Sequence, residues 1–170
     1  MKFNKRNVAA CILSGWYQLT GRLRHVKARA SRGEILLSVY FHDPDRNLFE
    51  SCVRWFLNQG YQIISLSDLE AVADGRKPFP SNAVVFTVDD GWKNNKENIA
   101  AVADQYGIPV TIFASTQPIE TGEAYWWSYA QAGMKEGLLR KSLSQLKALP
   151  DTDRKQLIAD IRAYRTCFRL

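Results

Sequence analysis

Residues 83–91 read Ala83-Val84-Val85-Phe86-Thr87-Val88-Asp89-Asp90-Gly91. An apolar, β-branched run that ends in two acids and a glycine is typical of a buried strand that carries charge to the open end of an α/β sheet. Adjacent carboxylates repel each other unless a cation or a shared proton relieves them, so the pair indicates a metal site or a general base. Asp-Asp-Gly is equally an ordinary turn sequence, and these residues alone leave both interpretations open.

The residues that follow predict a βαβ unit. Residues 96–106 carry apolar side chains at helical spacing, and Gly107 is a helix-stop residue. A second apolar strand is predicted over residues 108–113. Strand, acidic turn, helix and strand in this order put Asp89 and Asp90 where a parallel sheet opens, which favours a functional site over a plain turn.

Residues 85–91, together with Gly107-Ile108-Pro109-Val110-Thr111-Ile112-Phe113, resemble the first motif region of the polysaccharide deacetylases, the NodB-homology or carbohydrate esterase 4 family. The family motif is Thr-Phe-Asp-Asp-Gly, and Val88 stands at the position of its phenylalanine. Upstream, residues 35–42 are similar to the family's first strand, which often ends in Tyr-His. Residues 60–69 are similar to its second βα step.

The resemblance covers residues 35–130 and implies an α/β fold, the N-terminal portion of a distorted (β/α) barrel that is NodB-like and related to the TIM barrel. It implies a hydrolase of carbon–nitrogen bonds that removes N-acetyl groups from a bacterial cell-wall or exopolysaccharide glycan. By resemblance, Asp89 is the base that deprotonates a metal-bound water, and Asp90 binds the divalent metal. Zinc is the expected metal, with cobalt or nickel as alternatives, because such an ion lowers the pKa of bound water and polarises the carbonyl.

Histidines are scarce in this chain. The family completes its metal site with a downstream His-x-x-x-His motif, whereas the only histidines here are His25 and His42, both upstream. His42 follows an apolar strand and is a candidate second ligand, with a hydrogen-bonded loop histidine as the alternative. A catalytic zinc takes about three protein ligands. We therefore expect residues 34–170 to be a partial deacetylase domain, truncated before the histidine motif, that binds metal weakly and turns over little.

The positive charge is concentrated at the N-terminus. Residues 1–33 hold eight cations and no acid, whereas the rest of the chain has 15 basic and 17 acidic side chains. The segment predicts a basic amphipathic helix that contacts an anionic membrane surface or packs on the barrel. No recognised nucleic-acid module accompanies the charge, so no nucleic-acid partner is expected. Three widely spaced cysteines favour a reducing location, cytoplasmic or membrane-associated, with export left open.

The C-terminal part contains an aromatic stretch and two helical patterns. Tyr125-Trp126-Trp127 resembles a stretch that many of these deacetylases carry after the fourth strand. Trp126 and Trp127 are candidate substrate-binding residues that stack on sugar rings, with buried anchoring of the segment as the alternative. Residues 138–149 and 151–164 predict two solvated surface helices.

Two rival functions follow from the same residues. A phosphatase of the haloacid dehalogenase type requires Asp-x-Asp-Gly, and Val88 excludes that pattern. The second rival is a catalytically inactive deacetylase-like domain that binds glycan, membrane or a partner chain. Half a barrel exposes two strand edges, so self-association is expected in either case.

Overall fold

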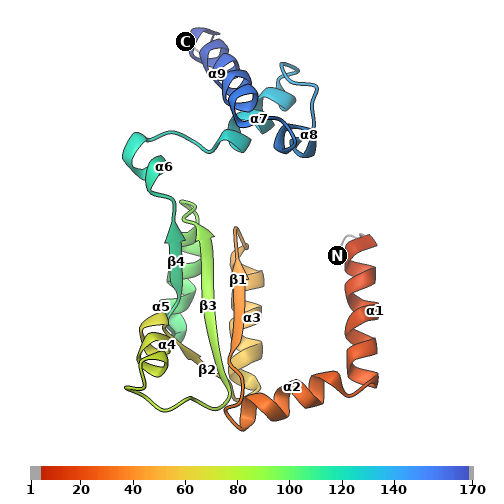
Figure 1. Ribbon diagram of the computed structural model, residues 1–170, viewed down its shortest axis with the longest axis vertical. Helices are drawn as coiled ribbons and strands as arrows, with labels where there is room; N and C mark the ends of the chain where they lie inside the picture. Colours follow the sequence, from red (N-terminus) through yellow and green to blue (C-terminus); the bar gives the residue numbers. More distant parts are fainter. Residues whose placement is uncertain (1–4, 169–170) are drawn as a thin grey trace. The chain divides into compact units, whose positions relative to one another are not determined.

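The computed structural model describes residues 5–168 and divides the chain into two compact units, Met1–Ala114 and Ser115–Leu170 (Figure 1). The first unit contains a parallel sheet with helices, and the second unit is helical. The predicted α/β class with a parallel sheet is confirmed. Each unit has its own buried core.

The first unit follows a strand–helix alternation. In chain order its elements are α1 (Lys5–Leu19), α2 (Arg22–Ser31), β1 (Leu37–Phe41), α3 (Arg46–Asn58), β2 (Gln62–Ile64), α4 (Leu66–Ala73), β3 (Ala83–Asp90), the π-helix η1 (Lys96–Ala100), α5 (Ala101–Tyr106) and β4 (Thr111–Ala114). Strand β3 is central and pairs in parallel with β1 on one side. On its other side, β2 pairs with the beginning of β3 and β4 pairs with its end. Closure of this sheet into a barrel stays a prediction.

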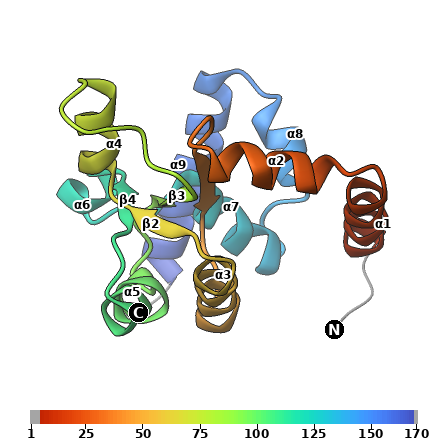
Figure 2. The same cartoon turned by 90° about the horizontal axis from the view of Figure 1, so that it is seen from below.

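The core of the first unit lies between the sheet and α3. Alternate side chains of β3, including Phe86 and Val88, are buried against Phe49 and Phe56 of α3. The ring of Phe86 makes edge contacts with those of Phe49 and Phe56, at centroid distances of 6.0 and 5.5 Å. Helices α3 and α5 lie on one face of the sheet and α4 lies on the other (Figure 2). This packing holds β3 rigidly and so fixes the position of the aspartates at its end.

The βαβ unit differs in detail from its prediction. The helix predicted over residues 96–106 begins as the π-helix η1 and continues as α5, and Gly107 ends it in the left-handed conformation. The strand predicted over residues 108–113 is β4, Thr111–Ala114. Pro109 has no amide hydrogen to donate to a ladder, and Ile108 packs against the core before the strand begins.

Residues 1–33, for which the sequence predicts one basic amphipathic helix, contain the two helices α1 and α2. Between them Gly21 takes a φ of 73°, which glycine adopts without steric cost. Helix α2 joins the core of its unit through Ala30, whereas α1 leaves Ile12 and Trp16 70% and 62% exposed. Among the described helices, none combines the length and apolar character needed to cross a membrane. The predicted domain boundary after residue 33 stays a prediction.

In the part of the second unit that the structure describes, the helices are α6 (Thr116–Thr121), α7 (Trp126–Lys135), α8 (Leu143–Lys147) and α9 (Asp151–Phe168). Its core contains Leu146 of α8 together with Ile158 and Ile161 of α9. The helix predicted over residues 151–164 corresponds to α9, whereas the helix predicted over residues 138–149 is shorter, because α8 spans only five residues. Each of the two helices buries an apolar face in the core of the unit. Those faces are covered within the unit, in part by α7, where Gly133 lies against Ile161.

Candidate active site

The carboxyl ends of β1 and β3 bring His42 next to Asp89. In the ladder between these strands, Phe41 is the partner of Val88, so the residues that follow are neighbours at the edge of the sheet. The Nδ1 atom of His42 lies 3.4 Å from Oδ2 of Asp89. The two side chains are 63% and 36% exposed, which leaves both within reach of a ligand.

Two exposed aromatic side chains share the sheet face of Asp89. Side chains alternate along a strand, so Tyr40 and His42 lie on the face opposite Phe41, which packs on the core. The ring of Tyr40 is exposed, with its centroid 6.0 Å from that of His42. On β4, Phe113 is the register partner of Asp89 and is also exposed. The sequence reasoning missed Tyr40 and Phe113, although the period-two alternation along each strand was the signal for them.

The residues Asp90 and Gly91 form a tight turn at the end of β3. Their φ angles are 71° and 67°, both in the left-handed region that aspartate tolerates better than most residues and glycine adopts freely. A Cβ atom on Gly91 would lie 2.8 Å from the Cβ of Ala114 on β4, so glycine is required by packing as well as by conformation. Asp90 and Gly91 therefore do form a turn, as one of the two interpretations of Asp-Asp-Gly expects. It does not compete with a functional role of the carboxylates, since strained conformations are concentrated at functional sites.

A set of hydrogen bonds joins the loop after β1 to the segment after β3. Asn94 donates from Nδ2 to Oδ1 of Asp43, 2.6 Å away, and Asn98 donates from Nδ2 to the carbonyl of Pro44, 3.2 Å away. These bonds hold the loop that begins at His42 close to the turn after the aspartates. The sequence reasoning missed them, because partners more than 50 residues apart leave no local pattern.

Asn95 is a further polar residue in this segment. It is 3% exposed, and neither its Nδ2 nor its Oδ1 has a hydrogen-bond partner in the described part of the chain. Buried amides are nearly always hydrogen-bonded, so an unsatisfied one needs an explanation such as a bound group. Asn95 is therefore a candidate for a polar contact with a bound group, and the sequence did not single it out.

The predicted metal ligands are Asp90 and His42. A carboxylate oxygen and an imidazole nitrogen are donors that zinc accepts, but a catalytic site needs about three protein donors and a water. Among the residues whose side chains the structure describes, no three histidine, cysteine, aspartate or glutamate side chains are grouped closely enough to hold one ion. The imidazole of His42 also faces Asp89. The described residues therefore do not make a zinc site by themselves.

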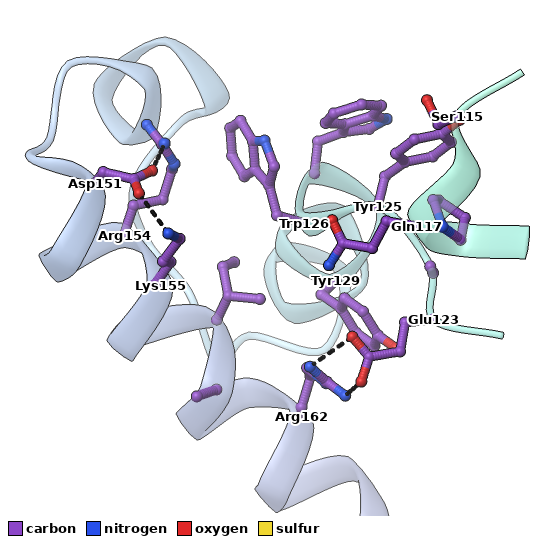
Figure 3. A pocket seen from close by; sticks show the side chains of 15 residues that line it. Ser115, Gln117, Glu123, Tyr125, Trp126, Tyr129, Asp151, Arg154, Lys155 and Arg162 are labelled. Carbon is purple, nitrogen blue, oxygen red and sulfur yellow. Dashed lines mark hydrogen bonds and ion pairs between the residues drawn. The ribbon is translucent and has the colours of Figure 1, made fainter. Parts of the chain in front are cut away.

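The predicted sugar-stacking residues, Trp126 and Trp127, lie in the second unit. They line a pocket of about 560 Å³ between α6, α7 and α9 (Figure 3). Trp126 packs against the core of the unit, and the guanidinium carbon of Arg154 lies 5.1 Å from its ring centroid. Trp127 stacks on Tyr125, with ring centroids 4.3 Å apart and planes 8° from parallel. The lining of this pocket includes neither aspartate of the β3 turn.

Two solved structures of deacetylases are similar to part of this chain. A solved structure of a de-N-acetylase from Aggregatibacter actinomycetemcomitans has 21% identity and a TM-score of 0.45, and the match covers 51% of this chain and 38% of that one. The BpsB deacetylase domain from Bordetella bronchiseptica has 17% identity and a TM-score of 0.40, with 45% and 36% covered. This chain thus spans less than half of either structure. No curated protein matches it.

The sequence pattern of one family, described as polysaccharide deacetylase, matches residues 76–168. The match covers more than half of the chain and includes Asp89, Asp90 and Gly91. This protein belongs to the polysaccharide deacetylase family.

Proposed function

We propose that this protein hydrolyses N-acetyl groups of a cell-wall or exopolysaccharide glycan, with Asp89 as the general base. The observation that carries the proposal is the pair of His42 and Asp89, 3.4 Å apart at the carboxyl edge of a parallel sheet. Such edges are where α/β folds place ligands. Membership of the polysaccharide deacetylase family gives the class of reaction.

Asp89 acts on the water that attacks the acetyl group. As the water oxygen bonds to the carbonyl carbon, one water proton passes to the Asp89 carboxylate. The carbon–nitrogen bond then breaks, and the sugar nitrogen takes up that proton to become a free amine. The acetic acid that leaves carries the second water proton and ionises to acetate in solution. His42 lies beside Oδ2 and orients the carboxylate, while Tyr40 and Phe113 flank the sheet face on which the sugar lies. A positioned general base typically contributes about 10²–10⁴-fold to the rate.

Asp90 is the residue that we propose as a donor to a divalent metal, zinc or in its place cobalt or nickel. When bound in a site of this type, such a metal polarises the amide carbonyl and lowers the pKa of its water. His42 would be a second metal ligand only if its imidazole rotated away from Asp89, which it faces in this structure. Because these two side chains do not complete a site, the steps above are assigned to side chains of this chain alone.

Acetate release tests the proposal. The full chain is incubated with N-acetylated chito-oligosaccharide and with peptidoglycan fragments, with added zinc or cobalt. We expect slow release that falls at least about 100-fold in Asp89→Asn, because the base is lost while the volume is kept. Asp104→Asn, an exposed carboxylate on α5, is the matched control and keeps the wild-type rate. No release from either glycan would instead favour the second candidate, an inactive domain that binds glycan.

We also propose that residues 1–33 contact an anionic membrane surface. Helix α1 exposes Ile12 and Trp16 in a segment with eight cations and no acid, a combination that suits the interface of an anionic bilayer. Co-sedimentation with phosphatidylglycerol vesicles, compared with phosphatidylcholine vesicles, tests this. Binding to the anionic vesicles alone that weakens in high salt and in Trp16→Ala supports it, and equal recovery with both lipids contradicts it.

We also propose that the chain associates with itself through exposed strand edges. In the described part of the first unit, β1 and β4 pair only with β3, so each presents an edge. Sedimentation at increasing protein concentration tests this, and a monomer at every concentration contradicts it.

A further inference from the structure

The pocket of the second unit has a flat aromatic wall. Trp127 stacks face to face on Tyr125, and Trp126 meets Trp127 edge-on with centroids 5.8 Å apart. Trp126 packs against the buried core of the unit, which accounts for it as an anchor. Trp127 and Tyr125 are not among the side chains of that core, are only half-buried and line the pocket instead. Core packing therefore explains Trp126 and does not explain the stacked pair.

The opposite wall, from α9, is cationic. Asp151 at the start of α9 pairs with both Arg154 and Lys155, as Figure 3 shows, and the Lys155 contact is 2.7 Å. These two cations share one carboxylate. Deeper along α9, Arg162 forms a two-bond pair with Glu123. Among the described side chains, three cations and two carboxylates line the pocket, and the surplus positive charge lies at the Asp151 end.

The Asp151 end is accessible to a ligand. The Lys155 side chain is 77% exposed, and the hydrogen bond that it donates lowers the pKa of Asp151. Because the Lys155 ammonium group is exposed, a second anion is able to share it. The Arg154 side chain is 21% exposed, so its guanidinium is the less accessible of the two cations. Gln117 of α6 supplies an amide donor and acceptor directed toward the pocket (Figure 3).

We propose that this pocket binds an acidic sugar residue of a glycan, a pyranose that carries a carboxylate. The apolar face of the sugar lies on the Trp127–Tyr125 stack, Gln117 bonds its hydroxyl groups, and the carboxylate lies near Arg154 and Lys155. The volume of about 560 Å³ is within the range of roughly 300–1,000 Å³ found for ligand pockets. The inference rests on the proposed function for the choice of a glycan as ligand, and it names the substrate class as acidic.

The test is a binding measurement on the full chain that needs no turnover. Tryptophan fluorescence and titration calorimetry are recorded with galacturonic acid tetrasaccharide, with chitotetraose and with sodium acetate. We expect the acidic tetrasaccharide to bind at least about tenfold more tightly than chitotetraose, since a charge-assisted contact is roughly twice as strong as a neutral one. Acetate alone is expected to bind far more weakly, because it has no ring to stack.

Variants separate stacking from charge. Trp127→Ala is expected to weaken the acidic tetrasaccharide about fivefold to tenfold, whereas Trp127→Phe keeps a ring and most of the affinity. Lys155→Met is expected to remove most of the preference for the acidic over the neutral glycan, and its exposed position leaves the fold intact. Trp55→Ala and Lys135→Met, exposed changes outside the pocket, are the matched controls and bind as wild type.

Equal affinity for the acidic and neutral tetrasaccharides overturns the proposal, and so does an unchanged affinity in Trp127→Ala. Acetate binding as tight as that of the tetrasaccharide also overturns it, because it indicates a simple anion site. Failure here is distinguishable from failure of the proposed function. Binding that persists without acetate release contradicts the hydrolase, whereas acetate release without selective binding contradicts only the acidic pocket.

Discussion

Replacement of Gly91 by alanine tests how the aspartate turn is held. Two costs are expected from the structure. A left-handed φ of 67° costs a non-glycine residue about 1–2 kcal/mol. The new methyl group would also lie 2.8 Å from the Cβ and 3.1 Å from the Cα of Ala114, and overpacking of this kind costs about 1–3 kcal/mol. Gly91→Ala is therefore predicted to lower the free energy of unfolding of the first unit by about 2–5 kcal/mol.

Amide hydrogen exchange of buried β3 residues, supported by urea denaturation, measures this free energy for the first unit separately from the second. Gly60→Ala is the matched control, because Gly60 has a φ of 75° and nothing within 4 Å of an added Cβ. It is predicted to lose only the conformational part, about 1–2 kcal/mol. Adding Ala114→Gly to Gly91→Ala removes the 2.8 Å contact with the Cβ and leaves the 3.1 Å contact with the Cα, so the double-mutant cycle isolates the Cβ contribution.

A loss in Gly91→Ala no larger than that in Gly60→Ala would refute the reasoning. It would mean that the turn does not pack on β4 as described. The position of Asp90, which is part of the turn, and that of Asp89, which precedes it, would then lose their structural support. A coupling energy near zero between positions 91 and 114 would refute it in the same way.

Further predictions concern the loop clamp, meaning the hydrogen bonds that Asn94 and Asn98 donate to the loop after β1, the buried amide of Asn95, and the pH dependence of stability that Asp68 of α4 causes. Asp43→Ala removes the acceptor of the Asn94 bond, so acetate release is predicted to fall several-fold while the free energy of unfolding changes by no more than about 1.5 kcal/mol; an unchanged rate would speak against the clamp. Asn95→Leu replaces an unsatisfied buried amide with an apolar group of similar size and is predicted to keep or raise the melting temperature while lowering acetate release; a fall in stability with normal activity would show a purely structural role. Hydrogen bonds from Lys77, and then from Ser65, lower the pKa of Asp68 from 3.8 to about 2, so its stabilisation of the folded state is present above pH 4 and is lost as the pH falls toward 2. The melting-temperature difference between wild type and Asp68→Asn should therefore shrink over that interval, and a difference that does not vary with pH would contradict the assignment.

Much of the first unit is predictable because its signals are local. The apolar run of β3 and the helix stop at Gly107 are read directly from neighbouring residues. The parallel sheet follows from their order. The π-helix at the start of the next helix and the late start of β4 are not predictable in this way, since they depend on how Ile108 and Ile99 fit the core.

Only part of the candidate active site can be predicted from the sequence. The motif indicates Asp89 and Asp90 as chemical residues, but the approach of His42 to Asp89 depends on the register between β1 and β3. The different environments of Trp126 and Trp127 depend on which ring faces the core of the second unit, and two adjacent tryptophans look alike in sequence. Non-local packing decides both cases, and a single sequence does not encode it in a local pattern.

The central claim is that Asp89 activates water to hydrolyse an acetamide. Its most direct test is mass spectrometry of the acetate released from N-acetylated chito-oligosaccharide in ¹⁸O-labelled water, with wild type and Asp89→Asn side by side. We predict that wild type yields acetate with one labelled oxygen and that Asp89→Asn yields no more than the protein-free blank. Labelled acetate at equal rates from both proteins, or none from wild type, would contradict the claim.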